Sequence, residues 1–206
     1  ETVRGALEAE RVVLATNGYT DGLWPGLARS IVPVYSAIVA TEPLLDTIAR
    51  QVMPGRSVLF EVGRLVVYYR LDRERRLLMG GRCPSRDISD IGALRYLSDY
   101  AVRLWPALAG VRWTHGWNGQ LAITADHYPH VHEPAENVHA CLGYNGRGVA
   151  MATAMGQVLA RRIGGAPAEA LPLPVTDIRP MAFHGLWRQA VAMRVAYGRI
   201  RDRLNL

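Results

Sequence analysis

A glycine-rich turn, Gly143-Tyr144-Asn145-Gly146-Arg147-Gly148-Val149, constrains the fold of this 206-residue chain more than any other feature. It follows a mostly apolar run, 138–142, and precedes a helix-like run, 149–162. Glycine lets the backbone bend tightly and approach a ligand without a Cβ in the way. The helix that follows offers free N–H groups and the positive end of its dipole. The turn therefore predicts a strand-to-helix junction. It serves either as a site for an electron-rich or anionic ligand edge or as a tight turn with no ligand.

Every fixed positive charge is an arginine, because the sequence contains no lysine. Schiff-base chemistry of the pyridoxal-phosphate or aldolase kind is therefore excluded within this chain, and so is a P-loop. The formal net charge is +6 and the pI about 9.7. The arginines are dispersed or interleaved with acids, as in the run 72–76. This pattern favours a solvated surface and predicts no nucleic-acid partner.

The two cysteines, Cys83 and Cys141, are far apart and form no CxxC pair. Redox-disulfide and zinc-ribbon sites are therefore not expected, and a reducing cytoplasm is the expected location. No apolar run approaches the roughly 20 residues of a membrane span. The first five residues resemble neither a chain start nor a signal peptide, so we expect them to come from the middle of a longer protein.

Hydrophobic periodicity predicts a mixed α/β (α+β) fold. Residues 2–14 are expected to form a short hairpin that ends in a buried strand, and 126–137 a polar loop. A helix is expected over 91–108, capped by Ser89 or Asp90 and ended by Pro106, and a basic amphipathic helix over 183–204. Strands are expected at 31–41, 58–61, 65–71, 77–81, 111–117, 121–124 and 138–142, with 58–81 as an antiparallel meander. The order suggests a substrate domain inserted into a nucleotide-binding domain.

Five segments, in order, carry a resemblance to one family. They are Val12-Val13-Leu14-Ala15-Thr16-Asn17-Gly18-Tyr19; Pro33-Val34 with Thr41-Glu42-Pro43; Tyr68-Tyr69-Arg70 with 77–81; a W-x-G…T-x-D-x-x-P pattern at Trp117, Gly119, Thr124, Asp126 and Pro129; and the glycine turn. Together they resemble the C-terminal portion of FAD-dependent oxidoreductases of the D-amino-acid oxidase/glycine oxidase superfamily. The likeness is closest to bacterial gamma-glutamylputrescine oxidase-like proteins.

The resemblance implies the C-terminal part of a Rossmann-like FAD/NAD(P)-binding domain with an inserted antiparallel-sheet substrate domain. It divides the chain into four parts: 1–30, the end of the FAD-binding domain; 31–112, the substrate domain; 113–165, the return to the FAD-binding domain; and 166–206, a linker and basic helix. The family's N-terminal G-x-G-x-x-G unit is absent, so an N-terminal FAD-binding half is an expected partner. The isolated chain is expected to be inactive.

The implied reaction is oxidation of the C–N bond of an amine or amino acid by hydride transfer to flavin. Gly119 stands where some relatives attach flavin through cysteine, so the expected FAD is non-covalent. Ala150 stands where sarcosine oxidases have a lysine, which argues against a sarcosine-like substrate clamp. The expected catalytic residues are Tyr68, Arg70 and His127. The expected cofactor-binding residues are Ala15, Thr16, Asn17, Gly119, Asp126, Gly143, Tyr144, Asn145, Gly146, Arg147, Gly148 and Val149.

Alternatives remain open at this point. Arg70 is either a carboxylate partner or a surface strand end, and His127 either lies near the flavin or is a loop histidine. The histidines 127, 130, 132 and 139 could suggest zinc or iron, but they lack a recognised ligand spacing with the nearby acids, and no metal is expected. The chain could also be a non-catalytic fragment, or an arginine-rich module for anions or membrane surfaces. The last helix could supply a weak peripheral membrane contact.

Overall fold

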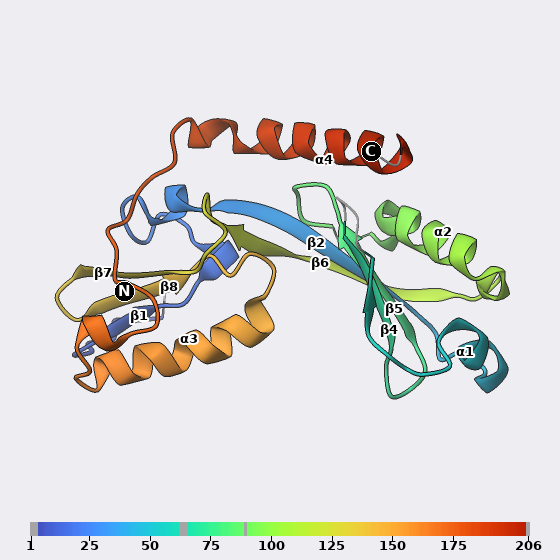
Figure 1. Cartoon of the computed structure of the whole chain (residues 1–206), viewed down its shortest axis with the longest axis horizontal. Helices are drawn as coiled ribbons and strands as arrows, with labels where there is room; N and C mark the ends of the chain where they lie inside the picture. The colour runs from blue at the N-terminus through green and yellow to red at the C-terminus, as the bar shows by residue number, and fades with distance from the viewer. Residues whose placement is uncertain (1–3, 62–65, 89, 205–206) are drawn as a thin grey trace. The chain divides into compact units, whose positions relative to one another are not determined.

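The computed structural model describes residues 4–61, 66–88 and 90–204. Its contacts divide the chain into two compact units, Glu1–Val34 with Leu121–Gly185 (unit 1) and Tyr35–Gln120 with Leu186–Leu206 (unit 2). The strands are β1 Val12–Leu14, β2 Val32–Thr41, β3 Leu59–Phe60, β4 Val67–Leu71, β5 Leu77–Arg82, β6 Trp113–Ile123, β7 His130–Ala135 and β8 Val138–Leu142 (Figure 1). The α-helices are α1 Asp46–Val52, α2 Arg95–Leu104, α3 Gly148–Ile163 and α4 Trp187–Leu204, and short 3-10 turns occupy Asn17–Tyr19, Leu27–Ser30, Ile91–Leu94, Pro106–Leu108, Ala168–Ala170 and His184–Leu186.

Unit 1 is built on a three-stranded sheet in the order β1-β8-β7. β1 runs parallel to β8, with Val12 opposite Val138, and β7 runs antiparallel to β8. Side chains alternate across β8, so Cys141 faces α3 while Ala140 and Leu142 face the opposite core. The helix α3 covers the face of Cys141 through Met155 and, one turn further along, Val158 and Leu159 (Figure 1).

Two expectations for unit 1 are wrong. Residues 6–11 lie outside any strand, so of the hairpin expected over 2–14 only β1 is formed in the described residues. The first strand of the expected hairpin begins at Val3, which lies outside the described residues. Leu7 is 90% exposed, and without an apolar face to bury, the segment gains nothing from pairing. The polar loop expected over 126–137 contains β7. The polar residues of β7 conceal the alternation of buried and exposed positions that marks a strand. His132 is nevertheless buried, and its ring hydrogen-bonds the Thr176 carbonyl. The β7–β8 pairing shifts register between His132 and Ala135, the segment that contains Pro134.

Unit 2 is built on a five-stranded sheet in the order β3-β4-β5-β2-β6. β3, β4, β5 and β2 pair antiparallel in turn, which confirms the meander expected over 58–81. The separate strands expected over 111–117 and 121–124 are one strand, β6. Asn118-Gly119 suggests a turn from sequence, but the Asn118 amide donates to the Arg86 carbonyl at 2.8 Å and its oxygen accepts from the Ile88 N–H at 3.1 Å. These tertiary bonds keep the backbone extended.

One face of this sheet packs against α1 and α2. Leu77, Met79, Leu94 and Ala101 are fully buried there, together with Leu108. Asp90 caps the turn before α2 by accepting the Gly92 N–H at 2.8 Å, and α2 ends at Leu104, just before Pro106, as expected. The basic helix expected over 183–204 is present as a 3-10 turn followed by α4. Among the described residues, no helix is both long and apolar enough to cross a bilayer.

Candidate functional site: a glycine turn and a polar sheet face

The glycine turn joins β8 to α3 through three residues with left-handed backbone. Gly143, Asn145 and Gly146 have φ angles of 84°, 52° and 86°. A Cβ built on Gly143 would lie 2.3 Å from Cγ2 of Thr124, closer than real Cβ contacts come. Glycine is therefore required at position 143 for two reasons. Its left-handed backbone favours glycine, and Thr124 at the end of β6 leaves no room for a Cβ.

Asn145 fastens the turn to the end of β6. Its N–H donates to the Ala122 carbonyl at 3.0 Å, and its side-chain oxygen accepts the Thr124 N–H at 3.0 Å. Its Nδ2 donates to Thr124 Oγ1 at 3.1 Å and to the Gly143 carbonyl. Thr124 Oγ1 in turn donates to the Tyr128 carbonyl at 2.8 Å. The side chain that sequence reasoning assigned to a cofactor is thus used to hold the backbone in shape.

Asn17 brings the end of β1 to the same place. Its Oδ1 accepts the Gly143 N–H at 3.1 Å, and its own backbone is left-handed, with φ 45°. The preceding residue, Thr16, shares a hydroxyl hydrogen bond of 2.7 Å with Thr20, while Ala15 is exposed. Because β1 and β8 are parallel, their carboxyl ends meet at one edge, where α/β sheets bind ligands.

Only some of the N–H groups at this edge are free. Asn145 and Arg147 use theirs internally, the latter on the Tyr144 carbonyl at 2.9 Å. No partner for the N–H groups of Gly146 and Gly148 occurs among the described residues. The first turn of α3 carries no acidic residue, and Arg147 and Val149 are exposed. The edge therefore presents N–H groups and a positive helix end that suit an electron-rich or anionic ligand.

Tyr144 has a structural setting. Its side chain packs with the core residues beneath α3, and its hydroxyl donates to the Cys141 carbonyl at 3.2 Å. Burial, with smaller contributions from Cys141, raises the pKa of the Tyr144 hydroxyl. Its ring also comes near the start of α3, because Tyr144 Cδ2 would lie 3.9 Å from a Cβ built on Gly148.

Asp126 and His127 lie in the loop after β6, in the same unit as the glycine turn. Partial burial acts to raise the pKa of Asp126, but the Tyr128 N–H and the His130 ring outweigh it, and the net pKa is lowered. Both Asp126 oxygens lie 3.1 Å from His130 Nε2. His127 is exposed and has a left-handed backbone, with φ 60°. Tyr68 and Arg70 belong to unit 2.

The histidines of this unit do not form a metal centre in the described part of the chain, where no three suitable side chains are grouped to hold an ion. The rings of His130 and His132 meet edge to face at 5.6 Å. Burial, the largest effect, lowers the pKa of His132 even though its Nδ1 lies 2.7 Å from the Thr176 carbonyl.

In unit 2, the expected catalytic residues lie on the sheet face away from the core. Tyr69 packs edge to face on Trp105 at 5.1 Å on the core side, so Tyr68 and Arg70 point the other way. We call this surface the Tyr68 face; by the register of β2, β4 and β5 it includes Ser36, Tyr68, Arg70, Gly80 and Arg82.

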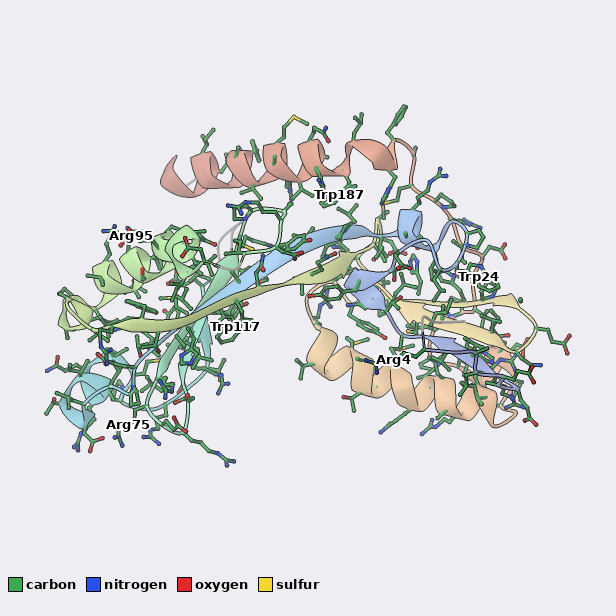
Figure 2. The ribbon with its side chains drawn as sticks, turned by 180° about the vertical axis from the view of Figure 1, so that it is seen from behind. Arg4, Trp24, Arg75, Arg95, Trp117 and Trp187 are labelled. Atoms are coloured by element: carbon green, nitrogen blue, oxygen red, sulfur yellow. The ribbon has the colours of Figure 1, made fainter. Side chains whose placement is uncertain are left out.

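On β6, Gly116 and Asn118 face the core side, so Trp117 and the half-buried Gly119 point to the opposite face of the same sheet (Figure 2). Gly119 therefore lies in unit 2, whereas the other expected cofactor residues lie in unit 1. Trp117 is 45% exposed and adds an aromatic ring to that face.

Sequence reasoning missed Arg82. It is the last residue of β5, one position beyond the predicted strand end at 81. Its Nη1 is buried and has no hydrogen-bond partner in the part of the chain that the structure describes, and burial lowers the pKa of its guanidinium. Continuing the two-residue period from Gly80 would have placed Arg82 on the Tyr68 face, but its burial could not be read from the sequence.

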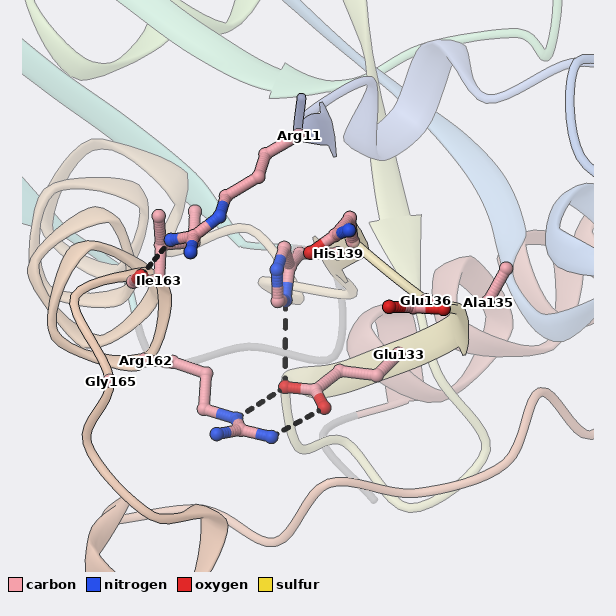
Figure 3. A pocket seen from close by; sticks show the side chains of 9 residues that line it. Arg11, Glu133, Ala135, Glu136, His139, Arg162, Ile163 and Gly165 are labelled. Carbon is pink, nitrogen blue, oxygen red and sulfur yellow. Dashed lines mark hydrogen bonds and ion pairs between the residues drawn. The ribbon is translucent and has the colours of Figure 1, made fainter. Parts of the chain in front are cut away.

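A second feature of unit 1 is a pocket of about 460 Å³ at the amino ends of β1 and β8 (Figure 3). Glu133 accepts from Arg162 at 2.6 and 2.9 Å and lies 3.5 Å from His139 Nδ1. Arg11 donates to the carbonyl of Ile163, at the end of α3. The Arg162–Glu133 and Arg11–Ile163 contacts tie the end of α3 to the sheet.

A strand-glycine-helix turn at the carboxyl edge of an α/β sheet is typical of proteins that bind nucleotide cofactors. Comparison with known proteins agrees. The model of the FAD dependent oxidoreductase family matches residues 1–162, so the chain belongs to that family. This confirms the resemblance and the α/β fold class predicted from sequence.

Two curated relatives illustrate the similarity. The chain is 31% identical over 169 residues to the probable oxidoreductase OrdL of Haemophilus influenzae, covering 80% of this chain and 38% of the relative. It is 29% identical over 211 residues to the gamma-glutamylputrescine oxidoreductase of Escherichia coli, covering 100% of this chain and 49% of the relative. The chain thus spans less than half the length of these relatives.

Solved structures show the same fold. An L-proline dehydrogenase from P. horikoshii matches with a TM-score of 0.63 at 23% identity, over 82% of this chain and 46% of that one. A glycine oxidase from Geobacillus kaustophilus matches with a TM-score of 0.63 at 22% identity, over 84% and 47%.

Proposed function

We propose that this chain is the C-terminal part of an oxidoreductase that binds FAD non-covalently and oxidises the C–N bond of an amine or amino acid. The glycine turn carries the proposal. The side chains of Asn17 and Asn145 hold its shape, while the N–H groups of Gly146 and Gly148 remain for a ligand. A Cβ at Gly143 would fill space that the turn needs.

FAD, when bound, would supply the hydride acceptor. The chain's own contribution begins at the turn, where the N–H groups and the dipole of α3 would stabilise negative charge on the cofactor's N1/C2=O edge. Asn17, Thr124 and Asn145 preorganise those N–H groups, so little reorganisation is needed when charge develops. Gly119 carries no thiol, which supports a non-covalent cofactor.

The substrate-binding residues are proposed on unit 2. The hydroxyl of Tyr68, 2.9 Å from Ser36 Oγ, offers a hydrogen-bonding group on the Tyr68 face. Arg70 is exposed on the same face, and its guanidinium suits a carboxylate. His127, in unit 1, is retained as a proposed substrate contact.

An N-terminal FAD-binding half is the proposed partner. β1 is an edge strand of the unit 1 sheet, and Val12 and Val13 are 42% and 43% exposed. An open edge of parallel sheet with uncovered valines fits the addition of a further strand, since parallel sheets are normally covered on both faces. The fraction of relatives that the chain spans agrees with such a half.

The intact gene product tests the function. Purified protein should show flavin absorbance that acid or heat releases into solution, and anaerobic gamma-glutamylputrescine or another amine or amino acid should bleach it. Flavin without bleaching by any member of an amine and amino-acid panel would refute the substrate class. Protein that contains no flavin and takes up no FAD would refute the proposal as a whole. Residues 1–206 alone should bind little FAD.

A further inference from the structure

The helix α4 carries an apolar seam on a side that the described residues leave uncovered. The seam consists of Leu186, just before the helix, and Ala190, Met193, Tyr197 and Ile200, and its four large side chains are 46–67% exposed. Neighbouring members are alternately four and three residues apart, so they lie on one face of the helix. We call these five residues the outer seam.

The outer seam is not what holds α4 to the rest of the protein. Val191 and Val195 are half-buried and Gly198 is buried, and these three positions share a different side of the helix. Helix geometry places that side about a third of a turn from the outer seam. The contacts of α4 assign it to unit 2. The helix therefore has two apolar sides, of which one is covered and the other faces outward.

The charges of α4 are strongly one-sided. Residues 187–204 contain five arginines and one acid, Asp202. Arg194 and Arg201 each follow a residue of the outer seam, so both lie along the same flank of it. No described residue forms an ion pair with Arg188, Arg194 or Arg201. The seam is thus bordered by cations whose counter-ion lies outside the described structure.

Arg201 is held directly against the seam. Its Nη1 donates to the Tyr197 hydroxyl at 3.1 Å, and its Cζ lies 5.8 Å from the centre of that ring. Its Nε is buried and has no hydrogen-bond partner among the described residues. An aromatic ring with a guanidinium beside its hydroxyl suits a boundary between hydrocarbon and charged headgroups, because each end of the pair meets the medium that it prefers.

A second copy of α4 would not satisfy these groups. In a coiled coil built on the seam, acids on one helix would have to pair with Arg194 and Arg201 on the other. The corresponding positions on the far flank of the seam are Gln189 and Ala196, which carry no charge. An anionic bilayer satisfies both parts at once, since it takes up the apolar stripe and offers phosphates to the arginines.

We propose that α4 docks on an anionic membrane surface, lying in the plane of the bilayer with the outer seam inserted among the lipid headgroups and acyl chains. Arg194 and Arg201 then extend from the edge of the seam to lipid phosphates. The partner is a phospholipid surface rather than a protein. The inference goes beyond the proposed function and does not depend on it, because neither flavin nor substrate contributes to the contact.

Vesicle flotation of the intact gene product tests the proposal. The probes are vesicles of phosphatidylcholine alone and vesicles in which about a quarter of the lipid is phosphatidylglycerol. At low salt the wild type should bind the anionic vesicles about tenfold or more tightly than the neutral ones, and added salt should weaken that binding by screening. Absent binding to anionic vesicles, or equal binding to both kinds, would overturn the proposal.

The seam is tested by Met193→Gln together with Ile200→Gln. Both side chains are exposed, so the protein should keep its fold while its affinity for anionic vesicles falls by about tenfold or more. Leu45→Gln is the matched control, because Leu45 is also an exposed apolar residue of unit 2, and it should bind as the wild type does. An equal loss in seam and control variants, or no loss in either, would refute a role for the seam.

The charge is tested by Arg194→Gln, again at an exposed position. Affinity for anionic vesicles should fall by about fivefold, the effect of one arginine near such a surface. Arg73→Gln removes the same charge from an exposed turn and should change nothing. Size-exclusion chromatography identifies the competing occupants. If the seam variant turns a dimer into a monomer, or releases a bound protein, and the wild type ignores vesicles, the seam is a protein interface and the proposal is wrong.

Discussion

The glycine turn and the Tyr68 face differ in which groups they leave without a partner, backbone N–H groups at the turn and a side chain on the sheet. At the turn, the side chains of Thr124 and Asn145 hydrogen-bond each other, that of Asn17 accepts the Gly143 N–H, and the N–H groups of Gly146 and Gly148 have no partner among the described residues. On the Tyr68 face, the backbone is paired within the sheet, and a side chain, Arg82, is left over. A site made of backbone depends on φ angles and on glycine, whereas a site made of side chains depends on strand register. The two should therefore respond differently to the same kind of substitution.

The largest effect is expected for Gly143→Ala. The left-handed backbone and the 2.3 Å approach to Thr124 both oppose a methyl group, and we expect a loss of about 3–5 kcal/mol in unfolding free energy. Thermal unfolding of the intact protein measures it. Gly156→Ala, within α3 and with nothing within 4 Å, should be neutral or stabilising by up to about 1 kcal/mol. Equal destabilisation by both would contradict this account of the turn.

Asn145→Ala should cost about 2–3 kcal/mol, because it removes the Thr124 hydrogen bonds and puts alanine at φ 52°. Asn137→Ala is the matched control. Asn137 has φ 58° but is exposed, so the change should cost only about 1 kcal/mol. Chemical denaturation of both variants isolates the contribution of the hydrogen bonds. If the two losses agree, the Asn145 side chain does not hold the turn.

Gly80→Ala tests the other region. Its methyl would displace the Tyr68 ring, a mobile side chain rather than backbone, and should cost about 1–2 kcal/mol. In a Tyr68→Ala background the same substitution should cost almost nothing, because the ring is gone. A double-mutant cycle by denaturant unfolding measures this coupling. Additive effects would show that the ring does not depend on Gly80.

The smallest effect is expected from the charge pair in the pocket of Figure 3. The Arg162 hydrogen bonds are the main reason that the pKa of Glu133 lies below its ordinary value of 4.5. A depressed carboxyl pKa contributes stability that is present above the ordinary value and is lost as pH falls through the folded-state value. The melting temperature should therefore fall more steeply below pH 4.5 in the wild type than in Glu133→Gln. Glu136→Gln, an exposed control, should follow the wild type.

Local patterns predicted much of the fold because they depend on short-range chemistry. The strand-glycine-helix order of 138–162, the Asp90 cap and the end of α2 before Pro106 all follow from neighbouring residues. The failures have a common cause. β7 and the middle of β6 owe their extended backbone to distant partners, such as Thr176 for His132 and Arg86 for Asn118. No periodicity within those segments reports such partners.

The sequence by itself determined the family, the strand-to-helix turn and the residues that surround it, because glycine positions and apolar runs act locally. Tertiary structure alone decided which N–H groups stay free, because the Asn145 N–H donates to a carbonyl of β6 and the Arg147 N–H to a carbonyl of the turn. It also decided how deeply each arginine of the Tyr68 face is buried. Arg70 and Arg82 look alike in sequence, but Arg70 is exposed, whereas Nη1 of Arg82 is buried without a hydrogen-bond partner among the described residues, because burial depends on packing that no local pattern reports.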